Sequence, residues 1–127
     1  MSDQFLPPDE PPERRRPARV PPNNIVAEES VLGAMLLTRE AVADAIEIVT
    51  DDDFYKPAHQ KIFRAITSLF ATGEPADIVT VADELDRAGL LEGIGGNSKL
   101  IELQANTPAA TNTTEYARIV YDNAQMR

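Results

Sequence analysis

The 127-residue sequence contains no cysteine, no tryptophan and a single histidine, His59. Without cysteine the chain forms neither a disulfide nor a thiolate zinc site, which fits a reducing compartment. One histidine also falls short of the ligand set of a transition-metal site. No apolar run approaches the roughly 18 residues that span a membrane, and the N-terminus lacks the apolar core of a signal peptide. We therefore expect a cytoplasmic protein without a membrane partner.

The familiar motifs of catalysis and nucleotide binding are missing as well. The sequence has no G-x-x-x-x-G-K-[ST] phosphate loop, no G-x-G-x-x-G, no G-x-S-x-G and no H-E-x-x-H. Gly93, Gly95 and Gly96 lie close together, but their spacing matches none of these patterns. We expect no catalytic, cofactor-binding or metal-binding residue in this chain.

Basic side chains are scarce in the part of the chain that is expected to fold. The formal net charge is −9, from 12 basic and 21 acidic residues. Four of each fall in residues 1–22, which leaves 8 basic and 17 acidic side chains in the other 105 residues. Such a surface repels a phosphate backbone. The sequence therefore favours an acidic interaction domain over a helical nucleic-acid-binding module. Filter binding to single-stranded DNA at low salt separates these two interpretations.

Proline, in contrast, is concentrated at the N-terminus. Residues 1–22 hold seven of the ten prolines, together with Arg14, Arg15, Arg16 and Arg19. Proline at this density blocks helices and sheet ladders, so the sequence predicts a disordered Pro/Arg-rich tail. The three consecutive arginines are most simply solvated, since nearby acids balance them.

The remaining sequence predicts an all-α fold, a compact bundle of about six helices. Apolar residues recur at three- and four-residue spacing, with capping residues at the ends of the segments. The segment 54–73 holds three of the four phenylalanines, so we expect its helix at the centre of the core. The expected helices cover residues 25–37, 39–49, 54–73, 81–89, 98–106 and 112–127.

Several local signals add detail to this outline. Gly33 lies inside the first helix, where glycine costs about 1 kcal/mol relative to alanine, so we expect a close helix–helix approach there. Thr80 and Asp83 form a cap-like pair. Residues 90–96 are expected to form a turn, and Asn97 is expected to cap the next helix.

His59 lies on the same side of its helix as the apolar residues Ile62 and Ile66. The nearest acids in sequence are Asp51–Asp53, so a small metal-dependent hydrolase built on these residues is a second alternative, tested by metal analysis. A buried histidine bonded to a backbone group or a carboxylate is the simpler interpretation.

The final helix carries more apolar surface than one neighbour covers. At about 100° per residue its apolar residues span an arc of roughly 200°, whereas one helix contact needs about 100°. We expect residues 23–96 to form a globular subdomain and residues 97–127 an antiparallel helical hairpin that leads toward a linker. The surplus arc is expected to face the rest of the chain or another chain.

Five sequence blocks follow one another between about residues 22 and 127. They are PPNNIVAEESVLGAMLL, DDFYKPAHQKIFRAI, GEPADIVTVADELDRAG, GG-x5-ELQANTPAA and EYARIVYDNAQMR. In this order they resemble the N-terminal domain of the bacterial replicative DNA helicases of the DnaB family. No single block is decisive, but the ordered set is specific.

The resemblance implies a role in DNA replication within a hexameric parent protein. In the family, hairpins pair into dimers, and three dimers form a collar that carries the docking surface for DnaG primase. A helicase loader is a further candidate partner. ATP hydrolysis with Mg²⁺ and DNA translocation belong to a C-terminal motor domain, whose motifs this chain lacks. The resemblance thus implies an enzyme as parent, an ATP-dependent helicase, and no catalytic residue here.

The same resemblance places the self-association contacts on residues 98–106 and 112–127. The expected interface residues are Leu100, Leu103, Tyr116, Ile119, Val120 and Tyr121.

Overall fold

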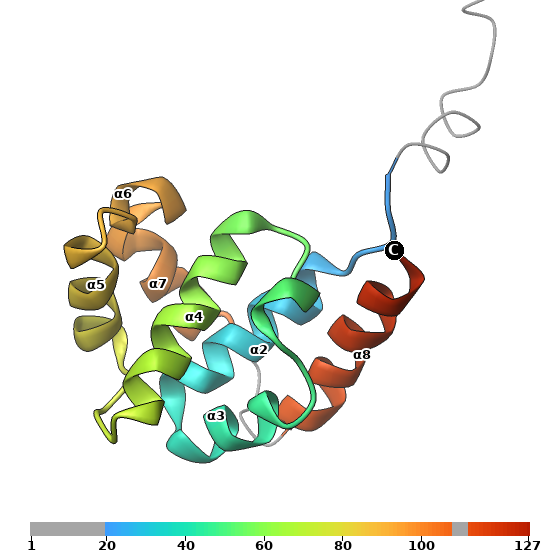
Figure 1. Cartoon of the computed structure of the whole chain (residues 1–127), viewed down its shortest axis with the longest axis horizontal. Coiled ribbons are helices and arrows are strands. Elements are labelled where there is room, and N and C mark those ends of the chain that lie inside the picture. The colour runs from blue at the N-terminus through green and yellow to red at the C-terminus, as the bar shows by residue number, and fades with distance from the viewer. Residues whose placement is uncertain (1–19, 108–111) are drawn as a thin grey trace, which may run out of the picture.

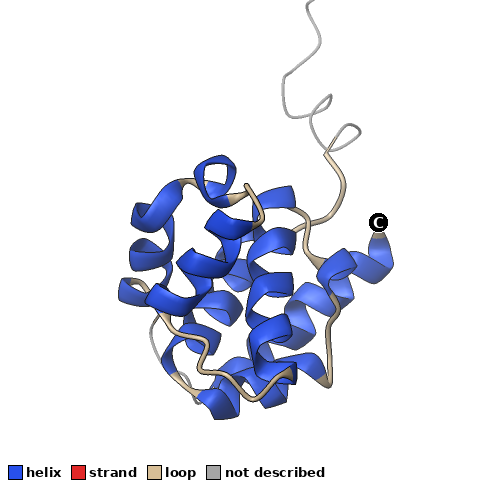
Figure 2. Cartoon of the chain, turned by 60° about the vertical axis from the view of Figure 1, so that its left-hand side comes forward, coloured by secondary structure: helices blue, strands red, loops and turns tan. Residues whose placement is uncertain are grey.

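The computed structural model describes residues 20–107 and 112–127, and every regular element in these residues is a helix (Figure 2). The all-α class is therefore confirmed. The tail predicted for residues 1–22 lies almost entirely outside the described residues. The elements are α2 (Ile25–Leu37), α3 (Arg39–Ile46), the 3₁₀ turn η1 (Asp51–Asp53), α4 (Pro57–Ala71), α5 (Ile78–Arg87), α6 (Leu91–Ile94), α7 (Gly96–Ala105) and α8 (Thr113–Met126).

Helix α2 is the central element of the bundle (Figure 1). It packs against α3, α4, α7 and α8, and nine of its 13 residues are buried. Its segment from Val31 to Leu37 contains no charged residue, and a helix that is apolar all round is buried on all sides. The helix expected at the centre of the core, in residues 54–73, belongs to the same hydrophobic cluster, so α2 and α4 form this core together.

Helix α4 buries the face that its apolar residues form at three- and four-residue spacing, as the sequence predicts. Pro57 occupies the first turn, where the missing N–H costs nothing. Ile62 and Ile66 are fully buried, and the ring of Phe63 lies 5.0 Å from that of Phe54, centroid to centroid. The aromatic residues thus fix α4 against the loop that follows η1.

The starts of α5 and α7 differ from the sequence prediction in their capping residues as well as in position. Helix α5 begins after Asp77, whose Oδ1 accepts from the Thr80 N–H (2.9 Å), while Thr80 Oγ1 accepts from the Asp77 N–H (3.0 Å). Asp83, the predicted cap partner, instead pairs with Arg87 at 3.2 Å. Helix α7 begins at Gly96, directly after Gly95, which adopts φ = 111°.

The correction at α7 has a physical cause. Residues 91–94, expected as part of a turn, form the short helix α6. The left-handed residue Gly95 reverses the chain there at no steric cost. The turn therefore ends one residue before Asn97, which does not cap the helix.

We expect Asp77→Ala to lower the free energy of unfolding by about 1 kcal/mol, because it removes the side-chain cap of α5. Asp83→Ala is the matched control, and it should change stability by less than about 0.5 kcal/mol, since its ion pair is exposed. Urea unfolding followed by circular dichroism measures both. Equal losses in the two variants would show that the cap does not stabilise α5.

The last two helices pack on α2 from different sides and not along each other (Figure 1). Arg127, at the end of α8, donates to the carbonyl oxygens of Pro22 (2.9 Å) and Asp53 (2.7 Å). The end of α8 thus lies beside the start of α2, so these two helices run antiparallel. The structure therefore replaces the predicted hairpin contact with two contacts to α2, whose apolar surface extends all round.

The close approach expected at Gly33 is confirmed. A Cβ atom at this position would lie 2.3 Å from the Leu103 carbonyl oxygen and 1.6 Å from Thr107 Oγ1. The Thr107 hydroxyl donates to Leu103 O at 2.8 Å and so occupies the space that glycine leaves. Glycine is therefore required where the end of α7 crosses α2.

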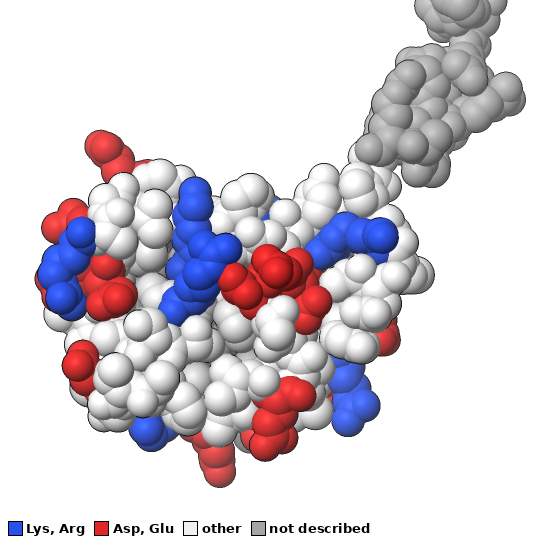
Figure 3. Space-filling view, in the orientation of Figure 1, with Lys and Arg blue, Asp and Glu red and all other residues white. Residues whose placement is uncertain are grey.

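On the face shown in Figure 3, a basic band lies over α4, and an acidic cluster lies beside it on the side of α8. Two acids of η1 are engaged within the chain, since Asp51 pairs with Arg64 and Asp53 Oδ2 accepts from the Thr50 N–H (2.9 Å). Within residues 20–107 and 112–127, no helix combines the length and the apolar character that a bilayer crossing needs.

Candidate functional site

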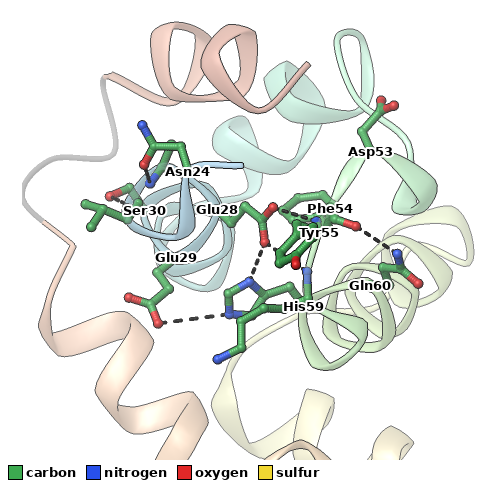
Figure 4. Close-up of polar contacts among 12 residues, drawn as sticks. Asn24, Glu28, Glu29, Ser30, Asp53, Phe54, Tyr55, His59 and Gln60 are labelled. Carbon is green, nitrogen blue, oxygen red and sulfur yellow. Dashed lines mark hydrogen bonds and ion pairs between the residues drawn. The ribbon is translucent and has the colours of Figure 1, made fainter. Parts of the chain in front are cut away.

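A buried polar pair joins α2 to α4 (Figure 4). Glu28 is 1% exposed and His59 is fully buried. Glu28 Oε1 lies 2.7 Å from His59 Nδ1. Burial of two such groups is tolerated because each finds a polar partner in the other.

The same carboxylate also holds the loop between η1 and α4. Glu28 Oε2 accepts from the Tyr55 N–H at 2.6 Å, and Glu28 Oε1 lies 3.5 Å from the backbone nitrogen of Lys56. The Gln60 side chain closes the loop from the other side, because its Nε2 donates to Phe54 O at 2.7 Å. One acidic side chain thus joins α2, the loop and α4.

Local sequence explains why Glu28 stands at this place. The Asn24 side chain caps α2 by accepting from the Ala27 N–H at 3.0 Å, so Glu28 falls in the first helical turn. An acid is favoured there by the partial positive charge of the helix N-terminus. His59 lies in the first turn of α4, which Pro57 starts.

A second acid lies on the other side of the imidazole. Glu29 Oε2 is 4.0 Å from His59 Nε2 and 3.0 Å from Lys99 Nζ on α7. His59 Nε2 has no hydrogen-bond partner among the described residues. Glu29 and Lys99 therefore continue the polar contacts of His59 from α4 across α2 to α7.

A carboxylate that orients a histidine is the arrangement of a general base. Here, however, the imidazole is fully buried, so a substrate has no access to it. The described residues hold no group of three or more His, Asp or Glu side chains placed to bind a metal ion. His59 also pairs with Glu28 and not with Asp51–Asp53, so the alternative hydrolase site is not assembled. The contacts of the pair are those that join α2, the loop and α4.

The residues expected at the self-association interface divide into two groups. Leu100, Leu103 and Val120 are at most 2% exposed and belong to the same buried cluster as α2. Tyr116 is half-buried against that cluster, whereas Ile119 is 38% and Tyr121 41% exposed. The first three offer no side-chain surface to another chain, so a charge at Val120 would act on folding. The predicted boundary near residue 97, between the globular subdomain and the hairpin, stays a prediction.

The exposed pair on α8 does not form one patch. Ile119 and Tyr121 are two residues apart, which separates them by about 200° around the helix axis. Between them lies the buried stripe that contains Ala117 and Val120. A single partner helix contacts one flank, and only Ile119 shares its flank with the exposed Met126, seven residues further on.

Sequence reasoning missed two features. Glu28 carries no motif, and nothing in the sequence distinguishes it from the adjacent acid Glu29 at the start of the same helix. Arg127 holds two backbone carbonyls and lies over the ring of Tyr55, 5.4 Å from its centroid. No local pattern marks either residue, because their partners are distant in sequence.

Comparison with known proteins adds to this geometry. A family model described as the DnaB-like helicase N terminal domain matches residues 20–122. The replicative DNA helicase DnaB of Mycobacterium leprae (strain TN) is 51% identical over 109 residues, which are 86% of this chain and 18% of that protein. The replicative DNA helicase DnaC of Bacillus subtilis (strain 168) is 45% identical over 109 residues, 86% of this chain and 24% of that protein.

A solved structure is similar along most of the chain. It is the crystal structure of the N-terminal domain of DnaB helicase from Mycobacterium tuberculosis, with a TM-score of 0.84 and 51% identity. The match covers 85% of this chain and 78% of that one. The chain spans only 18 to 25% of the length of its curated relatives.

Proposed function

The chain belongs to the family of DnaB-like helicase N-terminal domains, and we propose from this that it is the collar and assembly domain of a hexameric replicative helicase. The family match over residues 20–122 is the observation that carries the proposal. In this role the domain supports self-association and the docking of DnaG primase at replication forks in the bacterial cytoplasm. A helicase loader is a further proposed partner.

The activity proposed for the parent protein is ATP-dependent unwinding of duplex DNA. ATP and Mg²⁺ then belong to a motor domain outside this chain, and DNA is gripped there. The excess of acidic residues between positions 23 and 127 supports this division of labour, because it disfavours tight contact with a phosphate backbone.

We propose that self-association uses the flank of α8 that carries Ile119. This side chain is exposed in the single chain and lies beside the half-buried Tyr116. Burying apolar surface contributes roughly 25 cal/mol per Å², offset by the entropy of association. An isolated pair of domains is therefore expected to be only modestly stable.

Ile119→Asp should weaken self-association at least about tenfold, or about 1.4 kcal/mol, because a carboxylate without a partner is costly to bury. Sedimentation over a range of concentrations measures the effect. Val79→Asp is the matched control, since Val79 is 75% exposed on α5, far along the chain from residues 97–127. If the wild type and Ile119→Asp associate equally, this flank of α8 is not part of the interface.

Primase docking is tested in the same experiment with DnaG primase added. We expect a faster-sedimenting species that contains both proteins, because the collar presents the docking surface. If primase sediments alone at every concentration of this chain, the docking role is wrong, whereas the assembly role is judged by the first experiment.

A further inference from the structure

A groove of about 490 Å³ lies at the corner between α2 and α3, where the connection from α4 to α5 faces it. This volume is in the range that binds small ligands or anchoring side chains. Leu37 at its edge is 46% exposed although its neighbours in α2 are buried. The residues that give the groove its apolar walls are Met35, Leu37, Val42, Phe70, Pro75 and Ala76.

One cation is available at the rim. The Arg39 guanidinium lies over the ring of Phe70, 4.5 Å from its centroid, and this contact holds the charge in place. Among the described residues, no carboxylate forms an ion pair with Arg39. Asp77, the one acid among the described residues that line the groove, is engaged as the cap of α5. The groove therefore suits an apolar side chain that is accompanied by a carboxylate.

The chain itself contains a segment of this chemistry. In residues 3–10, DQFLPPDE, the apolar pair Phe5 and Leu6 is flanked by Asp3, Asp9 and Glu10. These two are the only phenylalanine and leucine residues before position 20, and they lie outside the described residues. The other three phenylalanines belong to the packed helical domain or line the groove.

The length of the chain allows this segment to reach the groove. The described residues begin at Val20, beside the start of α2, and the 13-residue helix α2 spans about 20 Å to the groove at its other end. Thirteen residues lie between Leu6 and Val20, and the chain from one to the other extends up to roughly 46 Å. Tethering of this kind gives an effective concentration on the order of millimolar, so even a weak contact is populated.

We infer that the groove at the α2–α3 corner binds residues 3–10 of the same chain, with Phe5 and Leu6 against its apolar walls and the flanking acids near Arg39. Residues 11–19 then act as the tether. The docked segment covers Leu37 and Phe70, and a partner that uses this groove has to displace it. This inference is independent of the collar role, which rests on the family match and on α8.

A spin label tests the contact in the full chain. Because the sequence has no cysteine, Ser2→Cys allows one nitroxide to be attached beside the segment. We expect the label to broaden the amide NMR signals of residues 37–39, 73, 74, 76 and 77. The broadening should be lost in Phe5→Ser/Leu6→Ser and reduced in Arg39→Glu, and it should remain in Arg118→Glu, a matched charge reversal on the exposed side of α8.

A mixed sample identifies which chain supplies the segment. Spin-labelled chain without ¹⁵N is added to ¹⁵N-labelled chain without the nitroxide, and we expect no broadening in that mixture. Broadening that appears only in the mixture would overturn the inference, because the segment would then bind a second copy. Broadening on another surface, or evenly over the whole domain, would overturn it as well.

Discussion

Replacing Glu28 by alanine should lower the free energy of unfolding by about 3–5 kcal/mol. The substitution removes the acceptor of the His59 Nδ1 contact (2.7 Å) and of the Tyr55 N–H (2.6 Å). Each buried donor left without a partner costs roughly 1–3 kcal/mol, and the shortened side chain leaves a cavity in addition. Urea unfolding of the variant and of the wild type, followed by circular dichroism, measures the difference.

The neighbouring acid provides the control for this result. Glu29→Ala removes a carboxylate that is 35% exposed and that pairs with Lys99 near the surface, so its loss should be below about 1 kcal/mol. If both variants unfold at the urea concentration of the wild type, the buried pair does not stabilise the domain.

A double-mutant cycle shows that the effect acts through the imidazole. His59→Ala alone should cost about 1–3 kcal/mol, as a core truncation. In the Glu28→Ala background, the further substitution His59→Ala should lower the free energy of unfolding by much less than it does in the wild type. The reason is that the two side chains are partners. Full additivity would mean that Glu28 acts only through the loop N–H groups.

Replacing Gly33 by alanine should lower the free energy of unfolding by about 2 kcal/mol. The new methyl group would lie 2.3 Å from the Leu103 carbonyl oxygen, and overpacking of this kind costs about 1–3 kcal/mol or more. This exceeds the gain of about 1 kcal/mol that alanine brings in a helix. The thermal unfolding midpoint and the urea midpoint should both fall.

Gly93→Ala is the matched control, since a Cβ atom there meets nothing within 4 Å. Its stability should be unchanged or slightly higher. Adding Thr107→Ala to Gly33→Ala should recover only part of the loss, because the contact with the Leu103 backbone persists. Complete recovery would show that the threonine side chain alone sets the need for glycine.

Much of the local structure followed from the sequence. Helix α2 has its predicted bounds, residues 25–37, because the capping residues Asn24 and Thr38 lie at its two ends. The buried stripe of α4 was predicted because apolar residues at helical spacing share a face. The starts of α5 at Ile78 and of α7 at Gly96 were missed by three and two residues, since several neighbouring residues are able to cap or turn the chain.

The interface residues stay a prediction, and two of them show what the sequence leaves open. Ile119 and Val120 are adjacent on α8 and equally apolar, yet Val120 is buried in this chain while Ile119 is 38% exposed. Helical periodicity shows which residues share a face, but it does not show which neighbour covers that face. The apolar arc of α8 was therefore visible in the sequence, while its division between α2 and the surface was not.

The sequence by itself determined the helical class, the bounds of α2, the buried stripe of α4 and the membership of a helicase domain family. These properties depend on residues close together in the chain, or on the order of blocks along it. Only the tertiary structure decided that Glu28 pairs with His59, 31 residues away, that Gly33 lies against Leu103, and that α2 stands between α7 and α8. The physical reason is that such contacts form when the packing of whole helices brings distant residues together, and no local preference of the backbone encodes that packing.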